Sequence, residues 1–318
     1  SALVSVVPAG DARTWSADPW RLRRAGDRFV GRGACDMKGG LAAIFGALAA
    51  LGDVAGEVPS VAVHCVIGEE DGGLGTFGTL ERGHGGDACV LAEPTGRRAV
   101  TANAGSLTFH LEVPGQAAHG SVRTQGVSAL DAATPVFAAL RDLETRRNRD
   151  VDPVVSHLDV AYPLSIGVVR AGDWASTVPD LLIAEGRYGV RIGESVEHAR
   201  AELQAAVAEA SAGDPWLSVH PARVSWPGGV FAPGRLAADD PLLLAVQSSC
   251  ADAAGWTPAS TGAPYGSDLR LYANAGIPTL QLGPGDVAAA HGADEYVPLA
   301  DLVDCARSYA VLALRVGR

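Results

Sequence analysis

The chain has 318 residues, of which 47% are hydrophobic and 19% charged, so it can build a well-packed core and is not a disordered protein. Its 25 Lys and Arg against 36 Asp and Glu give a net charge of −11, which disfavours nucleic acids and anionic membranes because both repel a negative surface. The longest apolar stretch, residues 41–51, is interrupted by Gly46 and is too short to cross a bilayer.

The first third of the chain alternates strand-like and helical patterns. Residues 2–7 predict a strand that stops at Pro8, and residues 37–51 place apolar side chains at the i, i+3, i+4, i+7 spacing of a buried helix face. Residues 60–67 and 88–92 are nearly continuous apolar runs, which are typical of central strands buried on both faces. This alternation predicts a layered α/β domain.

The middle of the chain follows a different order. The expected elements are a strand, a helix, two strands, a helix and a strand, at residues 107–113, 128–146, 164–169, 182–190, 196–210 and 216–226. The order β-α-β-β-α-β is that of the split βαβ sandwich, a compact unit in itself.

The tail returns to the α/β pattern. It has a helix at 241–254, a strand at 279–282 and a final helix near 299–316. We therefore predict that one domain is inserted into another. The domain bounds that we expect are residues 1–105 and 227–318 for the larger domain and 106–226 for the inserted one.

Four polar clusters lie at strand ends or in adjoining loops, where open α/β sheets bind their ligands. Their key residues are Asp36, Glu69, Glu70, Glu93 and His291. Each cluster also has a structural interpretation. Asp36 could cap the following helix, the acidic turn could be a solvated loop, and His291 could be a structural histidine.

The joint pattern favours a metal site. Like charges crowded at a buried strand end destabilise a fold unless a cation offsets them. One Asp, two Glu and one His at the same edge of a sheet supply the oxygen and imidazole ligands that suit zinc or a similar ion. Residues 73–78 satisfy G-x-G-x-x-G, but the acids at 69–71 just before them would repel a phosphate, which disfavours a nucleotide site.

Taken in order, these clusters resemble the M20 family of metallopeptidases and deacylases, the group of acetylornithine deacetylase, succinyl-diaminopimelate desuccinylase, aminoacylase and carboxypeptidase G. The resemblance spans nearly the whole chain. It rests on WSADPW at 15–20, GRGACDMKGG at 31–40, GEEDGG at 68–73, AEPTG at 92–96, AAHGS at 117–121, YGSDLR at 265–270, GPG at 283–285 and AHGADEYV at 290–297. It implies a zinc-hydrolase-type, three-layer α/β catalytic domain with an inserted α+β, ferredoxin-like domain that serves as a lid and forms a homodimer.

The resemblance also implies a site for two zinc ions, with Co²⁺ or Mn²⁺ as possible substitutes. Asp36 would bridge both ions, Glu93 would bind the first, and Glu70 with His291 would complete the second. Glu69 would be the general base, which takes a proton from the attacking water and returns it to the leaving amine.

Two further residues match family positions that contact the substrate. His119, in AAHGS, resembles the lid histidine that reaches the neighbouring subunit's site, where it is expected to donate to the developing oxyanion. The alternative is a surface histidine that caps the helix beginning near Ser128. Arg270, in YGSDLR, resembles an arginine that binds the substrate carboxylate as a planar bidentate donor, and the alternative is a structural ion pair.

The start of the chain departs from the family. The first metal histidine lies in H-x-D-V-V-P, whereas residues 3–8 read LVSVVP. Leu3 has no lone pair for a metal, and Ser5 cannot carry the charge of the aspartate that orients the histidine. The first zinc position would keep only Asp36 and Glu93, while the second keeps three protein ligands. A truncated or altered start and a genuine variant both stay open.

We expect a zinc-dependent amide hydrolase, a deacylase or peptidase, that acts on a small N-acyl amino acid or peptide-like substrate with a free carboxylate. The alternative, favoured by Leu3 and Ser5, is a catalytically impaired homologue that binds a ligand or partner as a dimer. The motifs do not encode the acyl group, because lid and pocket contacts determine it. Five cysteines without framework spacing, with Cys65, Cys89 and Cys250 in apolar runs, fit reduced core thiols and predict a cytoplasmic protein.

Overall fold

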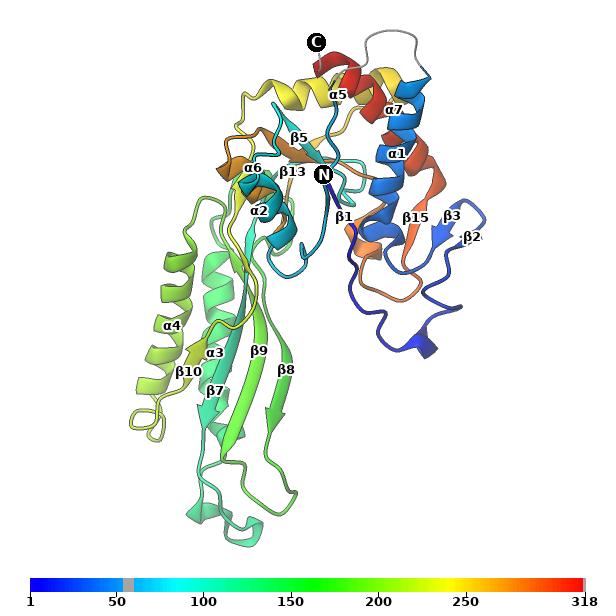
Figure 1. The fold of residues 1–318 in the computed structure, drawn as a ribbon. Coiled ribbons are helices and arrows are strands. Elements are labelled where there is room, and N and C mark those ends of the chain that lie inside the picture. The colour runs from blue at the N-terminus through cyan, green and yellow to red at the C-terminus, as the bar shows by residue number, and fades with distance from the viewer. Residues whose placement is uncertain (54–59, 317–318) are drawn as a thin grey trace. The chain divides into compact units, whose positions relative to one another are not determined.

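The computed structural model describes residues 1–53 and 60–316 (Figure 1). The chain divides into two compact units, and the second interrupts the first. Unit 1 comprises Ser1–Asn103, Gly234–Gly262 and Ser267–Arg318, and unit 2 comprises Ala104–Pro233 and Ala263–Gly266. The predicted α/β class is confirmed, since both units combine helices with β-sheets.

The main sheet of unit 1 has the strand order β12-β6-β14-β5, with β13 beside β6. Its strands are β5 (Cys89–Leu91), β6 (Ala99–Asn103), β12 (Gly234–Arg235), β13 (Ser260–Ala263) and β14 (Thr279–Gln281). The sheet is mixed, because β14 pairs in parallel with β5 and antiparallel with β6. A separate three-stranded sheet has the order β15-β3-β2, formed by β2 (Arg23–Ala25), β3 (Arg28–Val30) and β15 (Tyr296–Pro298).

The strand β1 (Ala2–Leu3) lies between β4 (Cys65–Val66) and β5. It pairs in parallel with β4. On its other side, the Ser1 nitrogen donates to the Val90 carbonyl over 2.8 Å, and the Ala92 N–H donates to the Ser1 carbonyl over 3.1 Å. The ends of β4 and β5, where the predicted site residues Glu69, Glu70 and Glu93 follow, are therefore brought to the same edge.

Three long helices pack in unit 1, namely α1 (Gly39–Gly52), α5 (Pro241–Ala254) and α7 (Leu299–Val316). The predicted helices at 241–254 and 299–316 are confirmed. Local signals set the bounds of α5: the Asp240 side chain accepts from the Leu242 N–H, Pro241 occupies the first turn, and Gly255 ends the helix in the left-handed conformation. Apolar side chains of α5 and α7 pack with Leu280 and Leu282 in one core cluster.

The helical residues 34–52 meet a length and composition test for a membrane span. This signal is weak, because the core helix of a globular domain passes the same test, and 44% of the apolar window is buried inside the protein. Gly39, Gly40, Ala43, Ala47 and Leu51 form the buried side of α1. Gly40 is required there, because an added Cβ would lie 2.1 Å from the Ala92 carbonyl oxygen.

Unit 2 is an antiparallel sheet of order β10-β7-β9-β8, with β11 beside β7, and α3 and α4 cover one of its faces (Figure 1). Its elements are β7 (Gly105–Pro114), α3 (Ala129–Arg147), β8 (Leu164–Ala171), β9 (Leu181–Val190), α4 (Val196–Ala212), β10 (Arg223–Ser225) and β11 (Val230–Phe231). The predicted order β-α-β-β-α-β is confirmed. Ser128 and Ser195 cap α3 and α4 through their hydroxyl groups.

Four predictions about local structure are wrong. The strand expected at 60–67 is reduced to β4, and residues 60–64 instead line a cavity of about 840 Å³. The strand expected at 216–226 is reduced to β10, because Asp214 accepts from the Trp216 and Leu217 N–H groups and folds that segment into turns. The strand at 2–7 ends at Leu3, and Cys65 is exposed rather than buried.

Candidate metal centre

Asp36 lies in an irregular segment immediately before α1. Its φ and ψ of −116° and 96° are not helical, and the peptide bond that follows it is cis. Lys38, not Asp36, occupies the N-cap position of α1. The interpretation of Asp36 as a helix cap is therefore wrong, and its carboxylate is available for another role.

The buried carboxylate of Glu295 holds this segment in place. Its Oε1 accepts from the N–H groups of Cys35 over 2.8 Å and Asp36 over 2.9 Å, and its Oε2 accepts from the Arg32 guanidinium over 2.5 Å. Arg32 also donates to the His291 carbonyl over 3.3 Å. One buried ion pair thus joins the segment that carries Asp36 to the loop that carries His291.

Glu69 and Glu70 lie in a tight turn after β4. The Gly73 N–H donates to the Gly68 carbonyl over 2.7 Å, and the Gly72 N–H donates to the Glu69 carbonyl over 3.0 Å. Gly68 and Gly73 have φ of 70° and 77°, a left-handed conformation that glycine adopts without strain. The turn leaves Glu69 buried and Glu70 half-buried.

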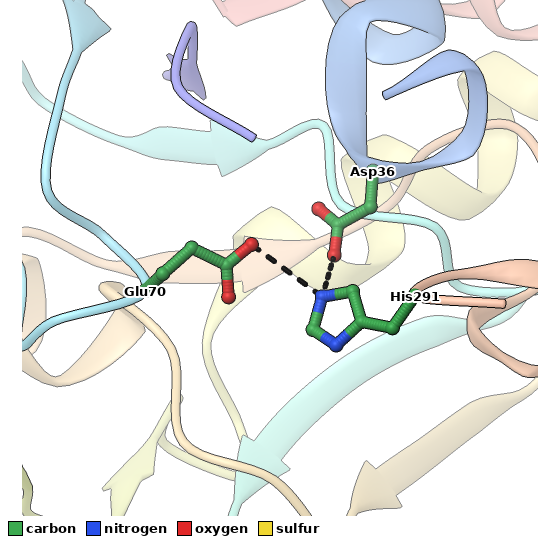
Figure 2. A group of neighbouring side chains, drawn as sticks. All are labelled: Asp36, Glu70 and His291. Carbon is green, nitrogen blue, oxygen red and sulfur yellow. Dashed lines mark ion pairs between the residues drawn. The ribbon is translucent and has the colours of Figure 1, made fainter. Parts of the chain in front are cut away.

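The side chains of Asp36, Glu70 and His291 converge (Figure 2). The His291 Nε2 lies 3.3 Å from Asp36 Oδ2 and 3.5 Å from Glu70 Oε1, and one ligand atom from each residue lies within 4.8 Å of the others. Asp36 Oδ1 and Glu70 Oε1 are buried, and neither has a hydrogen-bond partner within residues 1–53 and 60–316. Two oxygens and one imidazole nitrogen are a donor set that suits zinc.

Negative charge accumulates around this group. Burial raises the pKa of Glu69 and of Glu93 well above the usual range, and repulsion from Asp268 and Asp36 respectively adds to it. The adjacent carboxylates of Asp36 and Glu70 raise the pKa of His291 to about 10. The group is therefore electrostatically suited to a cation.

Comparison with known proteins agrees with this geometry. The family model described as peptidase family M20/M25/M40 matches residues 5–315. The chain belongs to this M20 family.

Relatives of this M20 chain are named for different activities. The acetylornithine deacetylase of Aliivibrio fischeri strain MJ11 is 28% identical over 298 residues, which cover 92% of this chain and 74% of that protein. The N-formyl-4-amino-5-aminomethyl-2-methylpyrimidine deformylase of Bacillus subtilis is 26% identical over 324 residues, which cover 95% of this chain and 75% of that protein.

Solved M20 structures share the fold. Human carnosine dipeptidase 1 has a TM-score of 0.78 at 16% identity and covers 99% of this chain and 79% of its own. The metallo-carboxypeptidase Sso-CP2 of Sulfolobus solfataricus has a TM-score of 0.76 at 15% identity, with 98% and 83% covered. With the family established, the chain is a hydrolase that acts on amide C–N bonds.

Leu3, at the position where the resemblance implies the first metal histidine, lies in an apolar core. Leu3 is 2% exposed and belongs to a cluster with Ala2, Met37, Val66 and Ala92. The Ser5 hydroxyl is buried and has no hydrogen-bond partner among the described residues. Glu93 is buried near Asp36 but is not one of the three converging ligands.

Arg270 is placed differently from the substrate-binding role that its M20 motif implies. It is 4% exposed, and its guanidinium donates to the carbonyl groups of Ser267 and Gly72, each over 2.7 Å. The Asp268 carboxylate lies 3.6 Å away. These contacts favour the structural alternative for Arg270.

His119 lies in unit 2 and is exposed. Its Nδ1 contacts the Ser121 hydroxyl over 2.7 Å and accepts from the Ser121 N–H over 3.2 Å, so it caps the short helical segment Gly120–Gln125. The helix α3 has its own cap in Ser128. The specific alternative that His119 caps the helix near Ser128 is therefore wrong.

Glu295 and Asp268 were not predicted to be site residues, although both lie inside the segments that resemble the M20 family. Both are almost fully buried. Their place in the matched segments was the available signal, but the sequence does not show which backbone groups an acidic side chain contacts.

Proposed function

We propose that this chain is a zinc-dependent amide hydrolase that acts on a small N-acyl amino acid or peptide-like substrate with a free carboxylate. The observation that carries the proposal is the convergence of Asp36, Glu70 and His291 with two buried oxygens that lack hydrogen-bond partners among the described residues. A divalent cation would satisfy both oxygens, and Co²⁺ or Mn²⁺ offers the same coordination chemistry as zinc.

The three residues fit the minimum ligand set of a catalytic zinc site. When bound, the ion polarises the amide carbonyl and lowers the pKa of water. Asp36 and Glu93 would hold a second ion weakly, because Leu3 adds no ligand. We therefore propose one tight ion and leave a second for measurement.

Glu69 is proposed as the general base. Its carboxylate is buried in the same turn as Glu70, beside the ligands and not among the three that converge. It takes a proton from the attacking water and later delivers it to the leaving amine nitrogen. Burial raises the pKa of Glu69, which makes its carboxylate a stronger proton acceptor.

His119 is proposed as a donor to the developing oxyanion in a homodimer formed through unit 2. The exposed imidazole of His119 uses Nδ1 for its contacts with Ser121, so Nε2 is the nitrogen that would donate to a partner subunit's site. Mixing Glu69→Gln protein with His119→Ala protein tests this arrangement, because a mixed dimer would contain one intact site. Recovered turnover supports the shared site, and two variants that remain inactive after subunit exchange contradict it.

The direct test of the proposed function combines metal analysis with a substrate panel. Purified protein supplied with micromolar zinc should retain the metal after gel filtration. N-acetyl, N-formyl and N-succinyl amino acids and short peptides should then be assayed with zinc or cobalt. A chain that retains no zinc, cobalt or manganese would end this proposal.

The second candidate is a catalytically impaired M20 homologue that binds a ligand or partner. The burial of Leu3 in an apolar cluster favours it, since a metal histidine cannot be replaced by that side chain. The double substitution Leu3→His and Ser5→Asp distinguishes the two. Hydrolysis that appears only in the double variant supports the second candidate, and a parent chain that is already active rejects it. We propose a cytoplasmic location for either, consistent with five free cysteines.

A further inference from the structure

The acidic turn that carries Glu69 and Glu70 is held from outside by a buried arginine. The Arg270 guanidinium spans the gap between α6 (Leu269–Asn274) and this turn, donating through Nη1 to the Ser267 carbonyl and through Nη2 to the Gly72 carbonyl. Both bonds are 2.7 Å long, and the side chain is almost fully buried. Hydrogen bonds from a charged donor in a buried place are among the stronger ones.

A second contact holds the other end of the turn. Asp268 is 2% exposed and accepts from the Thr76 hydroxyl over 2.5 Å, and Thr76 lies in α2 (Leu74–Glu81), which begins directly after the turn. The Asp268 Oδ1 packs so closely on Gly73 that an added Cβ there would lie 2.2 Å from it. Arg270 therefore bonds to Gly72, and Asp268 packs against the neighbouring Gly73.

We propose that Arg270 and Asp268 are positioning residues that fix the Glu69–Glu70 turn, and that Arg270 does not bind the substrate carboxylate. The proposal rests on the proposed function, because it assigns Glu69 and Glu70 their roles. Its physical basis is that both Nη atoms of Arg270 are directed at main-chain carbonyls of the protein. A displacement of the turn by about 1 Å would misplace the base and a ligand together, which typically costs about 100-fold in rate.

The two roles for Arg270 predict opposite kinetic results. The experiment uses Arg270→Met and the best N-acyl amino acid of the panel, together with its carboxamide, which lacks the carboxylate. A positioning residue predicts that kcat falls about 100-fold for both substrates while KM changes less than about threefold. A carboxylate-binding residue predicts instead a rise in KM for the acid only, with kcat and the carboxamide unaffected, and that result would overturn the proposal.

A readout without turnover separates this inference from the proposed function. Zinc alone is titrated against a chromophoric chelator, and amide exchange is followed at Gly72 and Gly73, whose N–H groups close the turn. Arg270→Met should weaken zinc binding about 10- to 100-fold, as loss of a supporting group typically does, and should speed exchange at both glycines. Unchanged zinc affinity and exchange would overturn the proposal. If the parent hydrolyses nothing, the proposed function fails, but these two measurements still decide the role of Arg270.

Two further variants show whether a loss of zinc affinity comes from the displaced turn or from misfolding of the whole protein. Gly73→Ala pushes the turn away from Asp268 while keeping Arg270, and we expect it to reproduce the loss of zinc affinity. Arg270→Lys keeps the charge beside Asp268 but cannot span both carbonyls, so it should recover part of the affinity. The matched control is Arg82→Met, an exposed arginine just past the far end of α2, which should change nothing. A Gly73→Ala protein with parental zinc affinity would contradict the inference.

Discussion

Two groups among residues 1–53 and 60–316 combine two acidic residues with one histidine at distances that could hold a metal, and they differ in what neutralises them. In unit 1 the group is Asp36, Glu70 and His291. In unit 2 it is Glu194, His198 and Glu202, where the fully buried Arg147 donates to both glutamates. One group contains its own cation, and the other has buried oxygens without hydrogen-bond partners among the described residues.

The pKa shifts separate the two groups in the same way. Burial opposes ionisation of Glu194, but hydrogen bonds from Arg147 outweigh it, and the pKa of Glu194 is lowered. Burial raises the pKa of Glu69 and Glu93 beside the unit 1 group, and the nearby Arg270 opposes the shift of Glu69 without outweighing it. A ligand-like set of side chains therefore indicates a metal only where the fold has not already supplied a positive charge.

The largest expected effect is on catalysis. Glu69→Gln should lower kcat about 10²- to 10⁴-fold, because the amide cannot accept a proton, while zinc affinity should change little because Glu69 is not a proposed ligand. Steady-state kinetics with zinc titration check both quantities. A variant with the parental rate would remove Glu69 from the mechanism.

The next prediction concerns the stability that Arg147 gives to the acidic group in unit 2. Arg147→Met should lower the free energy of unfolding by about 3–5 kcal/mol, because it leaves buried Glu194 and the partly buried Glu202 without their cation. Denaturant unfolding measures this loss. The zinc affinity of the folded variant should equal that of the parent, and a large drop would show that the two groups are not independent.

A pair of histidine variants compares the two groups directly. His291→Ala should weaken zinc binding by more than about 100-fold, beyond the usual cost of losing a supporting group, because it removes a proposed ligand. His198→Ala removes the exposed histidine of the unit 2 group and should leave zinc binding unchanged. Equal losses in the two variants would show that unit 2 also binds the metal.

The smallest expected effect is on the pH dependence of stability without metal. The folded-state pKa values of Glu69, Glu93 and His291 are all raised, so the stability they contribute is complete at low pH and falls as pH rises toward those values. Chelator-treated protein should therefore lose stability as the pH rises from about 6.5 toward 10, the range between the ordinary and the raised pKa of His291. The share of half-exposed His291 is about 1 kcal/mol after solvent screening. Thermal scans with and without zinc check this, because zinc should remove most of the slope.

The sequence was sufficient for the fold class and for elements with strong local signals. The helix α5 has a capping aspartate, a first-turn proline and a terminal glycine, so both its ends could be predicted. The apolar run at 60–67 was wrongly predicted to be a single strand, because hydrophobicity does not show whether a neighbouring strand is present to pair with it. Residues 60–64 line a cavity, and only Cys65 and Val66 pair with β1.

The candidate site could be predicted where strand ends determine it. The ligand atoms of Asp36, Glu70 and His291 converge, as the placement of their clusters at strand ends and adjoining loops predicted. The order of residues and their hydrophobic pattern do not show in which direction a long side chain points. Arg270 extends toward Gly72, and Glu295 toward the N–H group of Asp36, and those contacts depend on backbone geometry.

The contact between Glu295 and the Asp36 N–H joins residues that are 259 positions apart. A ribosome delivers the acidic turn before the histidine loop, so a nascent chain carries these carboxylates before their imidazole partner exists. The proposed metal site is therefore complete only after both segments have been synthesised.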